Sequence, residues 1–138
     1  MRTLTTAAVA LLLISGTAIA HPVVNSAGWD KFTKLTCFDV VHIASDFNQT
    51  DSSEVFSAKS EFDSRITDED EKVDYDPDLN ADQMELQHRH FQVVKQSIDT
   101  SFNQLIDLAG RGQQPDFVAL AGQECKSEMQ GLRSQYVH

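Results

Sequence analysis

The chain has 138 residues, of which 41% are hydrophobic and 23% charged, and it carries 21 acidic against 11 basic side chains. This length suits one domain with one modest core. A net charge of −10 argues against binding to nucleic acid or anionic lipid, because both require a basic surface that displaces counterions. It suits a basic protein partner or a cation instead.

The first twenty residues have the pattern of an export signal. Arg2 supplies a positive start, residues 7–14 (AAVALLLI) are continuously apolar, and Ala18-Ile19-Ala20 is a small-x-small cleavage site. The apolar run is too short to cross a bilayer, and no later segment resembles a stop-transfer sequence. We therefore expect a secreted or periplasmic chain, not inserted in a membrane, that begins at His21. Its net charge is −11, because the signal contains one base and no acid.

The first half of the mature chain has the periodicity of helices, and no sustained strand-like alternation appears. A first helix is expected to begin near Asn25 or Ser26, followed by apolar residues three or four apart. These residues are Trp29, Phe32, Thr36, Val40, Ala44 and Phe47. A second, short helix is expected over residues 52–66, with Ser52 or Ser53 as its cap. Residues 67–82 are rich in acids and without apolar period, which predicts an acidic loop.

The second half predicts two further helices. The longest pattern covers residues 82–109, with Asp82 as cap and Gly110-Arg111-Gly112 as stop signal. Pro115 suits the first turn of a last helix. The apolar residues of that helix are Val118, Ala121, Cys125, Met129, Leu132 and Tyr136.

The two cysteines connect this pattern to a fold. Cys37 flanks the apolar stripe of the first helix, and Cys125 lies on the stripe of the last. Two thiols in an exported chain most simply form one disulfide. We therefore predict a single all-α domain over residues 21–138, a small bundle of three to four helices tied by a Cys37–Cys125 bridge, with an acidic loop.

The acidic segment also contains oxygen-bearing side chains at the spacing of an EF-hand calcium loop. The twelve-residue window resembles that loop, although Leu79 stands where the family has Gly for a sharp turn. A solvated acidic loop and a docking site for a basic partner are the alternatives. The candidate calcium ligands are Asp74, Asp76, Asp78, Asp82 and Glu85, with Asn80 between them.

No other pattern predicts chemistry. The chain lacks G-x-S-x-G, H-E-x-x-H and C-x-x-C, so we predict no enzyme and no catalytic residue. His88 and His90, two apart on a helix, point to different faces and are not expected to chelate one metal. His21 becomes the N-terminus after cleavage, but copper binding there requires a second, well-placed His. No cofactor other than calcium is predicted.

One short segment resembles the Hde-type acid-stress chaperones of the bacterial periplasm, which are small, helical and tied by one disulfide. Thr36-Cys37-Phe38-Asp39 and Phe47-Asn48-Gln49 carry this resemblance. It implies a fold that loosens in strong acid and exposes apolar surface to client proteins. Protonating all 21 carboxylates and five histidines takes the mature charge from −11 toward +15, which fits such a response.

A second set of residues is similar to the periplasmic four-helix b-type cytochromes. These residues are Arg89-His90-Phe91, Ile98-Asp99, Leu108-Ala109, Arg133 and Tyr136. The resemblance implies a four-helix bundle. That family holds haem with a Met of the first helix and a His near the end of the last, whereas the mature methionines here are Met84 and Met129.

The expected function is that of an exported, non-enzymatic binding or interaction protein with a protein partner, for which a basic partner fits the charge. A periplasmic acid-stress chaperone of Hde-like type and a calcium-responsive module that uses residues 74–85 are the alternatives. The sequence leaves the oligomeric state open.

Overall fold

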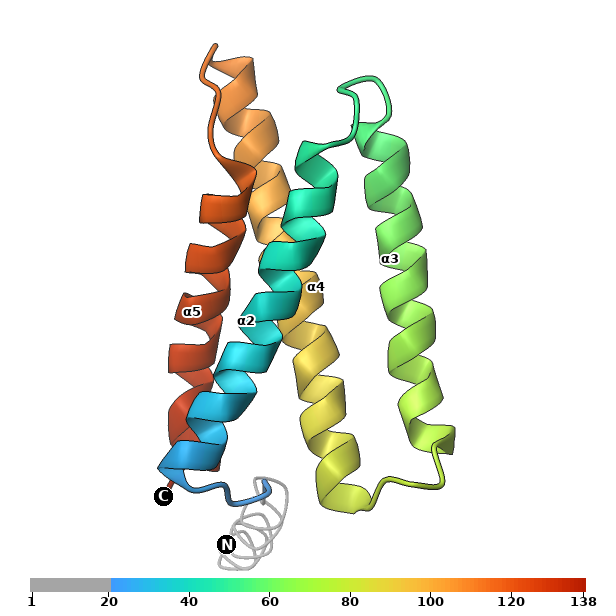
Figure 1. Cartoon of the computed structure of the whole chain (residues 1–138), viewed down its shortest axis with the longest axis vertical. Coiled ribbons are helices and arrows are strands. Elements are labelled where there is room, and N and C mark those ends of the chain that lie inside the picture. Colours follow the sequence, from blue (N-terminus) through green and yellow to red (C-terminus); the bar gives the residue numbers. More distant parts are fainter. Residues whose placement is uncertain (1–20) are drawn as a thin grey trace, which may run out of the picture.

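The computed structural model describes residues 21–138, and the predicted export signal, residues 1–20, lies outside this range. In the described range all regular structure is helical, which confirms the prediction of an all-α bundle tied by one disulfide (Figure 1). The elements are α2 (Ser26–Asn48), α3 (Val55–Lys72), the 3₁₀ helix η1 (Val73–Tyr75), α4 (Ala81–Gly110) and α5 (Phe117–Tyr136).

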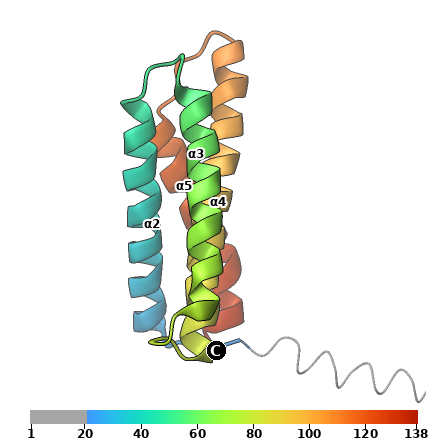
Figure 2. The ribbon, with the colours of Figure 1, turned by 90° about the vertical axis from the view of Figure 1, so that its right-hand side faces the viewer.

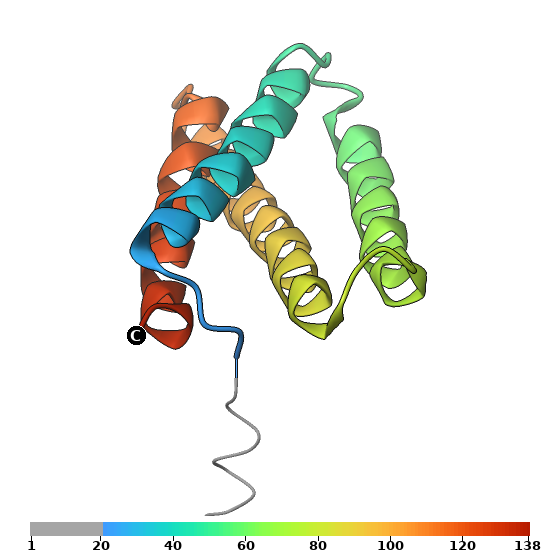
Figure 3. The same cartoon turned by 60° about the horizontal axis from the view of Figure 1, so that its bottom comes forward.

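The four helices do not pack equally. The closest packing joins α2 to α5 and α5 to α4, and α2 also contacts α4. In contrast, α3 packs on α4 and runs beside α2 with little backbone contact, as Figure 3 shows. The bundle is therefore a three-helix core of α2, α4 and α5, with α3 added at one side.

Buried apolar side chains fill the centre of this core. Val40, Ile98, Ala121, Cys125 and Tyr136 have no exposed surface. Four phenylalanines, Phe47, Phe62, Phe102 and Phe117, meet at the end of the bundle near the α2–α3 connection, with neighbouring ring centroids about 6 Å apart. Phe62 and Ile66 are the buried side chains of α3. The apolar anchorage of α3 is therefore small.

Side chains cap three of the helices at their N-termini. Asn25 accepts a hydrogen bond from Gly28 N, which confirms the predicted start of the first helix. Asn80 and Gln83 form a capping box at the start of α4, so the prediction of Asp82 as cap is wrong. Asp116 caps α5 and accepts from two backbone N–H groups. Pro115 therefore lies before the cap rather than in the first turn.

Glycine ends α4 as predicted. Gly112 has a φ of 78°, a conformation that L side chains rarely adopt. Its N–H donates to Ala109 O, and the N–H of Gln113 donates to Leu108 O. The last carbonyls of α4 are thereby satisfied, and the chain turns back toward α5.

The predicted acidic loop over residues 67–82 is wrong in its extent. α3 continues through this segment to Lys72, η1 follows, and only residues 76–80 lie outside helices. The helix continues because Val73 is buried and extends the apolar spacing of Phe62 and Ile66, and because His88 pairs with acids on this stretch. The second helix, predicted over 52–66, accordingly begins later and ends later, and neither Ser52 nor Ser53 caps it.

Candidate functional site

The disulfide joins the first and last described helices, as predicted. Cys37 on α2 and Cys125 on α5 are bonded, with their Cα atoms 5.6 Å apart. Cys125 is fully buried, and no described cysteine is free. The bridge holds α2 against α5 along the most closely packed pair of the bundle.

The structure does not gather the predicted calcium ligands at one point. Asp74 contacts His88, Asp76 accepts from the backbone N–H of Asp78, and Glu85 accepts from Tyr136. Asp82 lies in the first turn of α4. Leu79 does not make the sharp turn of an EF-hand loop, because no described residue other than glycine has a positive φ.

Within residues 21–138, no group of three or more His, Cys, Asp or Glu side chains is placed to hold a metal ion. Calcium binding by residues 74–85 therefore stays a prediction that has no support from the arrangement of these side chains.

His88 links α4 to the acidic end of α3. Its Nδ1 lies 2.7 Å from Asp70 on α3, and its Nε2 lies 2.7 Å from Asp74 on η1. Hydrogen bonds to Asp70 and then to Asp74 raise the pKa of His88 above its usual 6.5. The imidazolium form therefore fits this position between two carboxylates.

A second group of charges links the middle of α3 to α4. Lys59 Nζ lies 2.8 Å from Asp63 on its own helix and 2.7 Å from Asp99 on α4. Lys95 on α4 lies 2.8 Å from Asp99 and 3.5 Å from Asp63. Burial raises the pKa of Asp99, but hydrogen bonds from Lys59 and Lys95 outweigh it and lower that pKa below 3.8.

We call these two groups together the α3 clamp: His88 with Asp70 and Asp74, and Lys59 and Lys95 with Asp63 and Asp99. The clamp holds the helix that has the smallest buried apolar anchorage. The sequence analysis did not predict it. Lys59 and Asp63, like Lys95 and Asp99, are four residues apart on one helix, a spacing visible in the sequence. The pairs that join α3 and η1 to α4 are far apart in the chain, and the acids of 67–82 were expected in a loop.

His90 faces the opposite way, into the α2–α4 contact. Its Nδ1 lies 3.0 Å from Thr36 Oγ1, and its Nε2 lies 3.1 Å from Asp39. Burial lowers the pKa of His90, and the charge of Asp39 only partly opposes this. The order Thr–His–Asp has the composition of a catalytic triad, but Thr36 is fully buried and its hydroxyl donates to Phe32 O. This arrangement supports a structural role.

A polar cluster closes the end of the bundle at which residue 21 lies. The Tyr136 hydroxyl donates to Glu85 Oε2 at 2.7 Å, and Arg89 Nε donates to the same hydroxyl. His21 Nδ1 lies 3.3 Å from Glu85. The hydrogen bond from Tyr136 lowers the pKa of Glu85, against the effect of burial. His21 thus packs on this end of the bundle, beside Glu85 and the ring of Tyr136.

The outward side of α2 carries large apolar side chains that the core does not use. Phe38 is 69% exposed and Leu35 is 56% exposed, whereas the residues of the buried stripe are nearly inaccessible. Phe38 stacks on His42 with ring centroids 6.3 Å apart. We call this surface the α2 stripe, and its members are Lys31, Lys34, Leu35, Phe38, Val41 and His42. Its apolar members do not belong to the three- and four-residue spacing of the buried residues of α2. This departure is the feature of the sequence that could have predicted the surface.

A shallow cleft separates α2 from α3 near their connection. Its volume is about 170 Å³, and it is lined by Ile43, Asp46, Phe47, Thr50, Ala58, Glu61, Phe62 and Arg65. The floor is apolar and the rim is charged. Asp46 on this rim lies one turn beyond His42, so the cleft adjoins the end of the α2 stripe.

Comparisons with protein-family models, with curated proteins and with solved structures gave no match. Among the described residues, none of the helices is both long enough and apolar enough to span a bilayer. The resemblances to Hde-type chaperones and to b-type cytochromes therefore remain expectations. His90, which belongs to the second of these resemblances, is engaged with Thr36 and Asp39.

Proposed function

We propose that this chain is an exported, non-enzymatic binding protein and that the α2 stripe is its binding surface. The exposure of Phe38 and Leu35 carries the proposal, because each leaves more than half of its surface exposed on the described bundle. Burial of such side chains against a partner is the main source of affinity at protein interfaces.

Two further features support this surface as a binding site. The disulfide at Cys37 lies next to Phe38 and fixes α2 on α5. The backbone of the α2 stripe is therefore already ordered before a partner binds. The stripe also carries Lys31 and Lys34 in a chain of net charge −10. The α2 stripe offers apolar contacts beside two lysines. The rest of the surface is acidic and suits a basic partner.

Site-specific photo-crosslinking in the exporting cell tests the proposal. A photoreactive phenylalanine analogue replaces Phe38, and the same analogue at Gln130, an exposed position of α5, is the matched control. We expect a covalent adduct of defined mass at position 38 and none at position 130. Equal yields at both positions, or no adduct at either, would contradict a binding role for the α2 stripe.

A periplasmic acid-stress chaperone is the second candidate, and the α3 clamp favours it. Every cation of the clamp is paired with a carboxylate, so protonation leaves His88, Lys59 and Lys95 charged and without partners. Since the pKa of Asp99 lies below 3.8, its stabilising contribution is present at neutral pH and is lost as the pH falls through that lowered value.

Release of α3 in acid would uncover apolar surface on both sides of its contact with α4. Phe62 and Ile66 of α3 would be exposed, together with Phe102 of α4, whose ring packs on Phe56 of α3. Exposed apolar surface of this kind binds unfolding client proteins. The bridge between α2 and α5 is covalent and survives acid.

The chaperone candidate predicts binding of an apolar dye and suppression of client aggregation at about pH 2–3, well below the pKa values of carboxylates. Asp70→Asn with Asp99→Asn weakens the clamp in advance, so dye binding should begin at higher pH than in the wild type. Asp107→Asn is the control, because Asp107 pairs with Arg111 on the same helix. An unchanged onset in the double variant would contradict release through the clamp.

A further inference from the structure

We propose that the occupant of the α2 stripe is a second copy of this chain, with the two α2 helices packed antiparallel about a two-fold axis at Phe38. This inference rests on the proposed function, because it names the partner of the same surface. The observations that carry it are the place of α2 in the bundle, the spacing of the stripe, and the order of charges along it.

α2 stands at an edge of the bundle with one side open. Figure 2, turned by a quarter from the first view, places α2 at the margin, with α3, α4 and α5 all to one side of it. Phe38 and Leu35 are accordingly exposed over more than half of their surface. A partner helix can thus approach α2 from the side opposite the core, where Phe38 and Leu35 are exposed.

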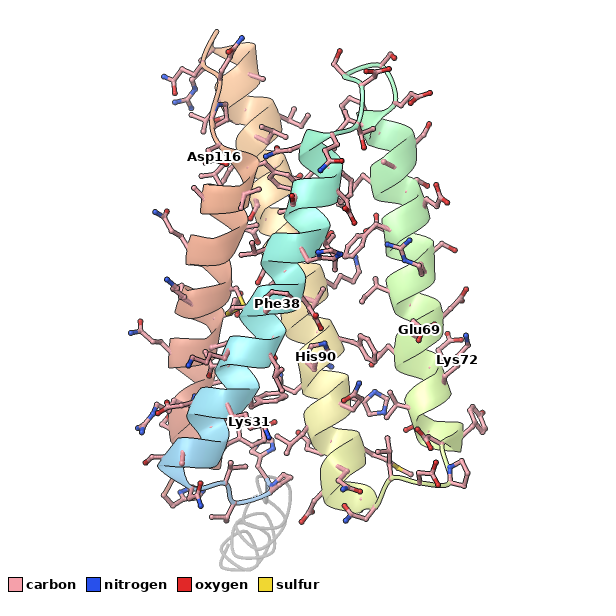
Figure 4. All side chains as sticks on the ribbon, in the orientation of Figure 1. Lys31, Phe38, Glu69, Lys72, His90 and Asp116 are labelled. Atoms are coloured by element: carbon pink, nitrogen blue, oxygen red, sulfur yellow. A yellow bond between two sulfur atoms is a disulfide. The ribbon has the colours of Figure 1, made fainter. Side chains whose placement is uncertain are left out.

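The stripe has the spacing of a helix–helix seam. Lys31, Lys34, Phe38, Val41 and Ser45 follow one another at intervals of three and four residues, which is the heptad spacing of packed helices. Leu35 and His42 flank the seam. Lys31 and Phe38, separated by about two turns, are labelled on α2 in Figure 4. The apolar side chains occupy the middle of this seam, two lysines lie at its first end, and Asp46 lies beside Ser45 at its other end.

The order of these residues is complementary to itself when reversed. In an antiparallel pair centred on Phe38, the two Phe38 rings meet, Leu35 of one copy falls opposite Val41 of the other, and Lys34 falls opposite His42. Lys31, about two turns before the centre, then reaches Asp46, about two turns after it. An antiparallel contact therefore pairs the base at one end of α2 with the acid at the other end. A parallel contact would place like charges opposite each other.

Analytical ultracentrifugation of the mature, disulfide-bonded chain, with charge-swap variants, tests the inference. We expect a dimer whose dissociation constant rises about tenfold in Lys31→Glu and in Asp46→Lys, because each substitution removes one ion pair from both halves of the contact. The double variant Lys31→Glu with Asp46→Lys restores the pair with reversed sign and should dimerise like the wild type. Lys126→Glu on α5 is the control for net charge.

The outcomes separate this inference from the proposed function. A chain that stays monomeric up to millimolar concentration overturns the second copy as occupant, as does a double variant that remains as weak as the single ones. Photo-crosslinking at Phe38 then identifies the partner of the α2 stripe. An adduct of twice the chain mass supports the homodimer. An adduct with another protein overturns it and leaves the proposed function standing, and no adduct overturns both.

Phe38→Ser supplies a measurement that is independent of charge. Phe38 is exposed, so its replacement should leave the melting temperature of the isolated chain unchanged within the uncertainty of the scan. We expect dimerisation to weaken at least tenfold, because the two rings form the centre of the contact. An unchanged dissociation constant would overturn the proposed geometry.

Discussion

His88 and His90 are two residues apart on α4, yet their rings serve opposite contacts. Nε2 of His88 lies 2.7 Å from Asp74 on the α3 side, and Nε2 of His90 lies 3.1 Å from Asp39 on α2. The two pKa values move apart, because paired carboxylates raise that of His88 and burial lowers that of His90. One turn of helix thus contains two imidazoles whose pKa values are shifted in opposite directions.

This difference is directly measurable. In an NMR titration of the imidazole Cε1 protons, we expect His88 to titrate above 6.5 and His90 below it. Asp70→Asn should lower the pKa of His88 and leave that of His90 unchanged, because Asp70 contacts only the first ring. Titration of both rings at one pH would contradict the assignment of the two environments.

His88 should also make stability depend on pH. Because its folded pKa is raised, its contribution is fully present below the unfolded value of 6.5 and is lost as the pH rises through the raised value. We expect His88→Gln to cost about 1 kcal/mol at pH 6, a small value because the pair is partly exposed, and little at pH 9. Urea unfolding at both pH values checks this, with His138→Gln as the control.

Tyr136 should stabilise the fold through its hydroxyl. The group is buried and donates to Glu85, so Tyr136→Phe should cost about 1 kcal/mol at neutral pH, discounted because Glu85 is partly exposed. Since the folded pKa of Glu85 is lowered, this contribution is present above about 4.5 and disappears as the pH falls through the lowered value. Tyr75→Phe, at an exposed tyrosine, is the control. A loss that is equal at pH 7 and pH 3 would exclude Glu85 as the partner.

The disulfide should supply a large part of the stability. It joins residues separated by 88 positions, and the chain-entropy model assigns a closed loop of this length about 4–5 kcal/mol. A domain of this size has a total stability of about 5–15 kcal/mol. We therefore expect Cys37→Ala with Cys125→Ala to lower the free energy of unfolding in urea titrations by about 4–5 kcal/mol, about a third of the total or more. A change below about 1 kcal/mol would show that the bridge restricts the unfolded chain much less than this model assumes.

Calcium should leave the melting temperature unchanged. The five candidate carboxylates do not converge, and several already accept hydrogen bonds from the protein. Melts in millimolar calcium and in EDTA compare the two states, because a ligand that binds only the folded chain must raise the midpoint. A rise of several degrees that is lost in Asp76→Ala would instead support the calcium prediction.

Periodicity was sufficient to predict the helices that bury a broad stripe. Trp29, Val40, Ala44 and Phe47 lie at the predicted spacing in α2, and all are buried. The cysteine pair followed from the same stripes, because Cys37 and Cys125 are on helices whose apolar faces meet. Each of these inferences uses contacts that repeat along the chain, which is why the sequence alone carries them.

The acidic segment shows where such reasoning ends. Val73 is one buried residue after a run of acids, too isolated to reveal a period. Two of the acids, Asp70 and Asp74, pair with His88 from another helix. Charge pairs across helices depend on tertiary packing that local propensity does not contain. The same holds for Thr36. The helical spacing of the first predicted helix places Thr36 in the core, but it does not indicate the contact of Thr36 with His90.

The backbone N–H of Val24 donates to the carbonyl of Tyr136 at 2.8 Å, so the two ends of the described chain meet at one end of the bundle. A short linker from residue 138 to residue 21 would close the domain into a circle, with new ends opened in the turn at residues 111–115. Such a permutant reverses the order in which α5 and α2 leave the ribosome while keeping every helix.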